Sequence, residues 1–303
     1  MINKKENGSI VKIAYVILHY NAYEMTVRCV DSIISSVGKE TVDCVIVDNH
    51  SPNGSGLKLK QRFQNKANIH VILNGENSGF AKGNNIGYDY AKYKLSADVI
   101  VDINNDVTID QTDFETVINK IVTTNDSIAV IAPKVFNRVG KNQNPFRIKP
   151  ERTLKLFKSI LTYGMYYVGL NSSFLWKLTY KFINRKALVI GESIEYDLYD
   201  IVPHGSCVIF TQSYVKKSDY AFLPITHFYG EEDILFDYVK NLGLRTYYCP
   251  ALCINHWEKV ATSTVSENVR ERALYQIKNK LQSYFPIIKY RFGLIKVDGV
   301  KEH

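Results

Sequence analysis

The chain has 303 residues, of which 46% are hydrophobic and 22% charged, so it can bury a sizeable core and lacks the composition of a disordered protein. Lys and Arg outnumber Asp and Glu by 38 to 30, and the formal charge of +8 favours anionic partners. No signal-peptide core opens the sequence and no apolar run approaches a bilayer-spanning length. We therefore expect a cytoplasmic protein with its five cysteines reduced.

Short apolar strands alternate with amphipathic helices through the first half of the chain. Strands that are apolar on both faces and separated by helices indicate a parallel sheet with helices on either side. The predicted strands span residues 11–20, 41–49, 68–75, 97–106 and 127–136, and the predicted helices span residues 22–37, 56–66, 79–93 and 113–124.

This alternation is lost after Asn137 and returns near residue 204, with predicted strands at 204–212 and 244–256 and a helix at 232–243. Gly243 follows that helix, where a C-cap glycine belongs. The fold class is therefore α/β, with a mostly parallel central sheet flanked by helices, an irregular basic insertion and a C-terminal helical tail. The expected division is a catalytic domain at 1–260, an insertion within it at about 140–190, and the tail at 261–303.

Three polar residues lie at predicted strand ends, where open parallel sheets bind their ligands. Asp48 closes the second strand, Asp106 the fourth and His256 the last. Each acid alone could instead cap the next helix, but three such residues at one edge favour a binding site. The loop after the first strand contains no glycine, which argues against a dinucleotide-binding fold, and no Walker loop is present.

Four segments together resemble family 2 glycosyltransferases, which have the GT-A fold. They are VKIAYVILHYNAYEMTVRCVDSI with CVIVDNHSPNGS, then NGENSGFAKGNNIGYDYA, then VDINNDV, and finally HFYGEEDILFDYVKNLGLRTYYCPALCINH. The second segment is similar to rhamnosyl- and galactosyltransferase-like members in particular. The resemblance covers about residues 10–260 in the family's order, and it implies inverting transfer of a sugar from a nucleotide-sugar to an acceptor hydroxyl.

The resemblance implies donor contacts along the first half of the chain. Asp48 resembles the residue that accepts a hydrogen bond from the N3–H of uracil or thymine, which favours a UDP- or dTDP-sugar. Lys82 is a candidate phosphate or ribose contact; alternatively it is solvated and its neighbouring glycines serve helix–sheet packing. The implied donor-binding residues are Tyr20, Asn21, Asp48, Asn49, Ser51, Gly79, Phe80, Lys82, Gly83, Asn84, Asn105 and Asp106.

A Mg²⁺ or Mn²⁺ cofactor is implied as well, because the leaving diphosphate must be neutralised and hard cations prefer carboxylate ligands. Asp106 is the expected ligand. Asn104 stands where the family's DXD-type motif has its first acid, which predicts weaker metal affinity. His256 resembles a further ligand used by some members, and the alternative is a hydrogen-bonded histidine at a strand end.

The acceptor hydroxyl must lose a proton as it attacks, so a carboxylate base is required. Alignment of Tyr229-Gly230-Glu231-Glu232 with the family's Tyr-Gly-Glu-Asp motif makes Glu232 the expected base, Glu231 the second choice and Asp233 the third. Alternatively these acids only supply negative charge to a helix N-terminus. Gly205 and Trp257 are expected on the acceptor side.

Residues 147–186 combine basic and aromatic side chains with a single acid, Glu151. This composition suits an anionic membrane surface, and the alternative is a flexible acceptor loop. Nucleic acid is not an expected partner because no known module matches. The basic residues are Arg147, Lys149, Arg152, Lys155, Lys158, Lys177, Lys181, Arg185 and Lys186.

The leading hypothesis is an inverting enzyme that transfers a rhamnose-, galactose- or glucose-type sugar to a lipid-linked glycan in cell-surface polysaccharide synthesis, at the inner face of the cell membrane. A second hypothesis is a catalytically silent nucleotide-sugar-binding subunit of a glycan-assembly complex, and a third is a basic scaffold at the membrane. The helical tail leaves a homo-oligomer open.

Overall fold

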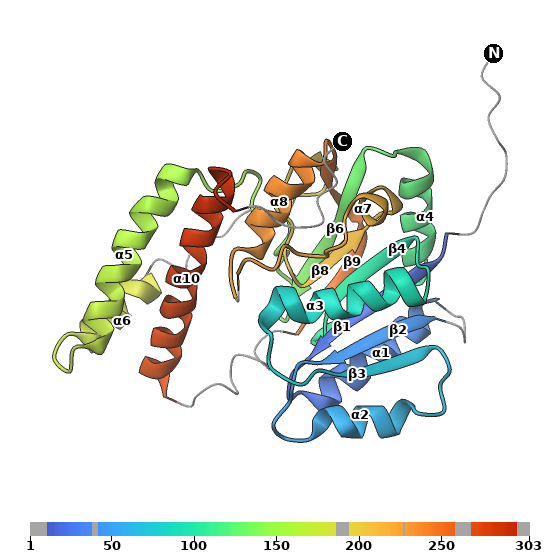
Figure 1. The fold of residues 1–303 in the computed structure, drawn as a ribbon, viewed down its shortest axis with the longest axis horizontal. Helices are drawn as coiled ribbons and strands as arrows, with labels where there is room; N and C mark the ends of the chain where they lie inside the picture. The colour runs from blue at the N-terminus through green and yellow to red at the C-terminus, as the bar shows by residue number, and fades with distance from the viewer. Residues whose placement is uncertain (1–10, 38–41, 186–193, 227, 258–267, 296–303) are drawn as a thin grey trace, which may run out of the picture.

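The computed structural model describes residues 11–37, 42–185, 194–226, 228–257 and 268–295. Their centre is one nine-stranded sheet with helices on both faces, and a layer of long helices stands to one side of it (Figure 1). The strands are β1 (Ile13–His19), β2 (Asp43–Asp48), β3 (Ile69–Leu73), β4 (Val99–Asn104), β5 (Val107–Thr108), β6 (Ile128–Asn137), β7 (Leu198–Tyr199), β8 (Cys207–Phe210) and β9 (Arg245–His256).

The sheet has the order β3-β2-β1-β4-β8-β6-β9-β5, with β7 beside β9. Strands β1 to β4 are parallel, as the alternation of strands and helices predicts. Strand β8 runs antiparallel to both β4 and β6, whereas β6 and β9 are parallel. The mostly parallel α/β fold expected from the sequence is therefore confirmed.

The expected helices of the α/β part are also present, and two elements were not foreseen: a π-helical turn, η1 (Tyr90–Lys94), and the short helix α7. The helices are α1 (Tyr23–Val37), α2 (Ser55–Phe63), α3 (Gly79–Asp89), α4 (Phe114–Thr124), α5 (Thr153–Asn171), α6 (Trp176–Arg185), α7 (Gln212–Lys217), α8 (Glu231–Asn241) and α10 (Val269–Arg291).

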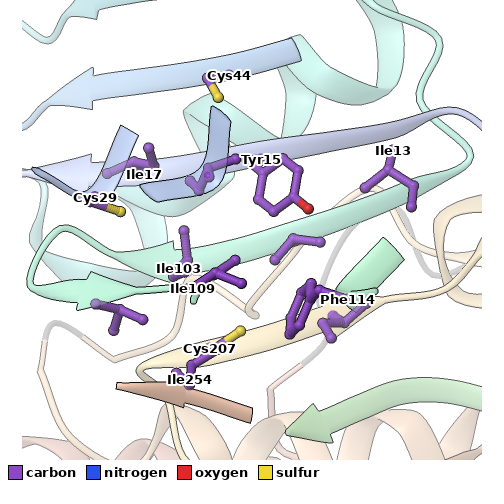
Figure 2. Close-up of a cluster of buried hydrophobic side chains, with 14 of the residues drawn as sticks. Ile13, Tyr15, Ile17, Cys29, Cys44, Ile103, Ile109, Phe114, Cys207 and Ile254 are labelled. Atoms are coloured by element: carbon purple, nitrogen blue, oxygen red, sulfur yellow. The ribbon is translucent and has the colours of Figure 1, made fainter. Parts of the chain in front are cut away.

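Two hydrophobic clusters fill the two faces of the sheet. Side chains of α1, α2 and α4 cover one face, and those of α3, α7, α8 and α10 cover the other. Figure 2 shows part of the first cluster, in which Cys29, Cys44 and Cys207 lie among isoleucines. All five cysteines are free thiols and four are buried, so they pack as small apolar side chains, as expected.

The insertion differs from the sequence-based expectation, because its described residues 153–171 and 176–185 are helical. It folds into α5 and α6, and α10 lies along α5 (Figure 1). Leu170 of α5 packs with Ala273 and Ile277 of α10. Periodicity failed to predict α5 because its exposed face is as apolar as its buried face, so the usual contrast is missing.

No helix in the part of the chain that the structure describes is long and apolar enough to cross a membrane. Lys186 of the basic insertion lies outside the described residues.

The fit of α3 on the sheet yields a stability prediction. A Cβ on Gly87 would lie 2.4 Å from Cγ1 of Val16 and 3.1 Å from Cγ2 of Val47. Gly87→Ala should therefore destabilise the fold by ~1–3 kcal/mol through overpacking, which exceeds the ~0.5–1 kcal/mol gained from helix propensity. The measurement is the unfolding free energy by chemical denaturation.

Gly164 provides the matched control, because it also lies inside a helix and a Cβ there would meet no atom within 4 Å. Gly164→Ala should stabilise the protein by ~0.5–1 kcal/mol. Equal effects of the two substitutions would contradict the close packing of α3.

Candidate functional site

Asp48 ends β2 in a buried turn and is tied to the residues that follow it. Its Oδ1 accepts hydrogen bonds from Oγ of Ser51 at 2.5 Å and from the amide of Ser51 at 3.2 Å. The Nε2 atom of His19 lies 3.9 Å from the same oxygen. Burial lowers the pKa of His19 to about 4, so this ring is neutral at pH 7. The two hydrogen bonds from Ser51 do not use every lone pair of the Asp48 carboxylate, so the carboxylate can accept a further hydrogen bond.

Tyr20 and Asn21 follow β1 beside this turn. Asn21 adopts a left-handed conformation with φ of 61°, and its amide donates to Oγ of Ser51 at 2.9 Å. Its buried Oδ1 has no hydrogen-bond partner within the described residues. Ser51 therefore connects the ends of β1 and β2, and Asn21 retains an unused acceptor beside them.

The glycine-rich segment is held by Asn49, whose side chain donates to the carbonyl of Gly79 at 3.1 Å and to Asn77 at 3.0 Å. A Cβ on Gly83 would lie 2.7 Å from Leu18, so this glycine serves helix–sheet packing. Lys82 is exposed. The packing of Gly83 agrees with one part of the alternative, and the donor contact of Lys82 stays a prediction.

Two other residues of the segment have different surroundings. Phe80 packs against Phe222, with ring centroids 5.1 Å apart and the ring planes tilted by 59°. Asn84 is 1% exposed, and neither its Oδ1 nor its Nδ2 has a partner among the described residues. A buried amide without partners is costly, so Asn84 has hydrogen-bonding capacity that no described residue uses.

Asp106 and His256 come together although 150 positions separate them. Pairing of β5 with β9 sets Val107 opposite His256, and Oδ1 of Asp106 lies 3.3 Å from Nε2 of His256. The Nδ1 atom of His256 donates to Oε1 of Gln143 at 2.9 Å. In the neutral ring the lone pair is thus on Nε2, facing the carboxylate.

This pair fits a divalent cation, because two electron-pair donors face each other across a distance typical of neighbouring ligands in an octahedral site, roughly 3 Å for Mg²⁺. Within the described residues no group of three or more His, Cys, Asp and Glu side chains could hold a metal. The protein thus offers two ligands, and a bound diphosphate would have to supply others.

Asn105 and Trp257 border this pair. Nδ2 of Asn105 donates to Oγ1 of Thr26 at 3.0 Å, so the side chain points toward α1. The amide of Trp257 donates to the carbonyl of Asp106 at 2.8 Å, and Arg28 lies 3.9 Å above its indole ring. Trp257 is therefore fixed next to the backbone of Asp106, and its expected place on the acceptor side stays a prediction.

The three acids at the start of α8 have three different environments. Glu231 is 4% exposed and accepts from Oγ1 of Thr226 at 3.0 Å. Asp233 forms an ion pair with Arg147. Glu232 accepts a hydrogen bond from the amide of Gly205 and is partly exposed. Of the three, Glu232 is the one able to meet a substrate.

Burial raises the pKa of both glutamates. It raises the pKa of Glu231 to about 8, and the charge of Glu232 adds to this shift. Burial also raises the pKa of Glu232, with a smaller contribution from Asp233, whereas Arg147 and the Gly205 amide oppose the rise. An efficient general base has a pKa near the working pH, so a raised pKa makes a carboxylate better suited to this role.

A cavity of about 200 Å³ opens beside Glu232. Tyr163 of α5 and Tyr284 of α10 line it together with Tyr229. The Nζ atom of Lys280 lies 5.3 Å from the ring centroid of Tyr163 and 5.5 Å from that of Tyr229. Aromatic faces and a cation beside a base form a suitable acceptor cleft.

Sequence reasoning missed several residues of this region. Gln143 orients His256, and the ring of His204 lies 5.5 Å from that of His256. Burial lowers the pKa of His204 to about 3. Their segments lay in or next to the part of the chain without periodic pattern, so only the HGS run before β8 could have indicated a strand-end histidine.

Known proteins resemble the chain in both sequence and fold. The model of glycosyl transferase family 2 matches residues 15–179, more than half of the chain. The low-salt glycan biosynthesis hexosyltransferase Agl10 of Haloferax volcanii is 32% identical over 159 residues, which are 52% of this chain and 46% of that protein. The chain thus spans about half the length of this relative.

Solved structures show the same architecture at low sequence identity. GalNAc-T7 with UDP, GalNAc and Mn²⁺ has a TM-score of 0.54 at 13% identity, over 83% of this chain and 44% of that one. TarS 1–349 of S. aureus has a TM-score of 0.51 at 14% identity, over 95% of both chains. The fold is thus that of GT-A glycosyltransferases, and the chain belongs to glycosyl transferase family 2.

Proposed function

We propose that the protein transfers a hexose-type sugar from a UDP- or dTDP-sugar to a hydroxyl of a glycan acceptor, with inversion at the anomeric carbon. The observation that carries this proposal is the position of Glu232, a partly exposed carboxylate at the mouth of a tyrosine-lined cavity. Agl10 is named a hexosyltransferase, and TarS 1–349 was solved in complex with UDP-GlcNAc.

In this proposal the donor lies along the ends of β1, β2 and β4. Asp48 accepts from the N3–H of the uracil or thymine base, and the unpartnered Oδ1 of Asn21 and side chain of Asn84 supply further polar contacts. Asp106 and His256 hold Mg²⁺ or Mn²⁺, which supplies positive charge next to the diphosphate when bound.

Glu232 acts as the base. Its carboxylate accepts the proton of the acceptor hydroxyl while that oxygen attacks the anomeric carbon and the nucleoside diphosphate leaves from the opposite side. The Gly205 amide fixes the orientation of the carboxylate. Glu231 is buried and accepts a hydrogen bond from Thr226. It therefore positions the start of α8 and does not reach the substrate.

The acceptor lies in the tyrosine-lined cavity, with Gly205 and Trp257 on the same side of the site. We further propose a lipid-linked glycan of cell-surface polysaccharide as acceptor, a rhamnosyl- or galactosyltransferase-like specificity, and work at the inner face of the cell membrane. Residues 1–260 form the catalytic unit in this proposal, and α10 completes the wall of its acceptor cavity.

A catalytically silent nucleotide-sugar-binding subunit is the second candidate. It is favoured by Asn104, which replaces an acid of the metal motif, and by Glu232, which stands where the family's motif has an aspartate. Such a subunit would bind a UDP- or dTDP-sugar, but it would not release UDP or dTDP from that sugar with any acceptor present. Turnover therefore separates the two candidates.

The first test concerns the metal. Asp106→Asn removes the negative ligand while preserving side-chain shape, so Mn²⁺ should no longer strengthen binding of UDP. In the wild type, ligand at ~100 times its dissociation constant should add ~2.7 kcal/mol of stability. The measurement is thermal unfolding with UDP, with and without Mn²⁺. Asp126→Asn, an exposed acid in the turn before β6, is the control, and an equal Mn²⁺ effect in all three proteins would eliminate Asp106 as a ligand.

The second test concerns the base. Glu232→Gln keeps the shape and the bond from Gly205 but removes basicity, so sugar transfer should fall by ~10²–10⁴-fold while donor affinity is unchanged. Glu231→Gln is the matched control and should retain most activity, because Thr226 can still bond its side chain. Wild-type rates in both variants would mean that the base lies elsewhere.

The third test is the pH dependence of kcat/KM. The base must be deprotonated to act, and the pKa of Glu232 lies above the ordinary value of 4.5. Activity should therefore fall as pH decreases through this raised pKa, about tenfold per pH unit on the acid limb. A kcat/KM profile that stays flat down to pH 4.5 would contradict a base with a raised pKa.

A further inference from the structure

The hairpin of α5 and α6 exposes an unusually large apolar surface. On α5, bulky apolar residues recur every three or four positions, and Leu161, Met165 and Val168 are 71%, 67% and 70% exposed. We call the whole set the α5–α6 face. It consists of Leu154, Phe157, Leu161, Met165 and Val168, followed by Phe174, Leu175, Leu178 and Phe182.

This face is not the one that α5 uses for packing. Tyr163 and Leu170 lie on the opposite side of the helix and contact α10, which stands between α5 and the sheet in Figure 1. The α5–α6 face therefore points away from the rest of the described molecule. Monomeric proteins rarely leave a contiguous surface of this kind uncovered.

The charge of the hairpin indicates what covers it. Residues 153–185 contain no Asp or Glu, in a chain that has 30 acids. Lys158, Lys177 and Lys181 are exposed beside the apolar side chains. Helices with bulky apolar residues on one side and lysines along its margin lie in the interface of anionic membranes.

A second copy of the chain is a poorer occupant. A twofold interface would place the same face on both subunits, so it would bring lysines together without any acid on either helix to pair with them. We propose that the α5–α6 face docks the protein on the surface of an anionic lipid bilayer, with the apolar side chains in the headgroup region and the lysines at the phosphates.

The orientation gives this surface a role. Because Tyr163 lines the cavity beside Glu232 while Leu161 and Met165 face outward, one helix connects the bilayer to the acceptor cleft. A lipid-linked acceptor would then enter the cleft from the membrane along α5. This step rests on the proposed function, whereas docking on the bilayer does not.

The experiment is flotation of the full chain with vesicles, without donor or acceptor. Vesicles of equal parts phosphatidylcholine and phosphatidylglycerol should carry the wild type, and vesicles of pure phosphatidylcholine should carry much less. Leu161→Gln with Val168→Gln should reduce binding at least tenfold, and Lys158→Gln with Lys177→Gln by about fivefold for each charge at low salt.

Leu57→Gln is the control for apolar loss, because Leu57 lies on α2 and is 65% exposed; it should bind as the wild type does. Absence of wild-type binding, or equal loss with Leu57→Gln, would overturn the proposal. So would a wild-type dimer that Leu161→Gln with Val168→Gln converts to a monomer in light scattering without vesicles.

Thermal unfolding of each variant checks that these exposed substitutions leave the fold intact, and the lysine pair keeps the test valid if the apolar pair does not fold. Donor turnover is measured in the same samples without vesicles. Turnover without vesicle binding would refute only the docking surface, and vesicle binding without turnover would refute only the proposed transferase.

Discussion

Three consecutive carboxylates at the start of α8, two buried and one partly exposed, are the constraint on which the arrangement of the site depends. Like charges this close cannot all be left ionised and unpaired in a dry environment. Each therefore has its own partner: Thr226 for Glu231, the Gly205 amide for Glu232, and Arg147 for Asp233. The three partners come from three separate segments, so satisfying the carboxylates fixes those segments around them.

The partner of Asp233 has the widest consequence. Arg147 belongs to the stretch that leads into α5, and the amide of Glu151 also donates to Asp233 at 3.2 Å. From the other side, a Cβ on Gly230 would lie 2.5 Å from Ile287 of α10. The helical layer is thus attached where the proposed base is held. The cleft beside Glu232 and the α5–α6 face are therefore parts of one packed unit.

Much of this architecture could be predicted from the sequence because it depends on local pattern. The apolar runs and helical spacings gave the strands and helices up to residue 136, and the rule that ligands bind beyond strand ends selected Asp106 and His256, which do meet. Local pattern could not give the direction of β8, because an antiparallel strand has the same composition as a parallel one. Because β8 is reversed, its first residues lie beside the end of β4, where the amide of Asn104 donates to the carbonyl of Ser206. The neighbouring Gly205 thereby reaches Glu232.

The helical insertion was unpredictable for another reason. Amphipathic helices are recognised by contrast between faces, and α5 has apolar residues on the side toward α10 and on the side toward the surroundings. The lack of contrast indicates how α5 is surrounded, because apolar side chains on both sides of a helix favour an apolar environment on each side. One of them is α10, and the second is the bilayer in our proposal.

Two acids four residues apart, one within β4 and one beyond its end, show why the proposed chemistry lies at the strand end. Asp102 is in the middle of β4, 1% exposed, and neither carboxylate oxygen has a hydrogen-bond partner in the described part of the chain. Burial raises its pKa well above the ordinary value, because an ionised carboxylate is costly in the core of the sheet. Asp106 stands just beyond the last residue of the strand, where His256 faces it. Burial within the sheet thus opposes the ionised form of a carboxylate, whereas the carboxylate beyond the strand end faces a histidine, as the ligand pair of our proposal requires.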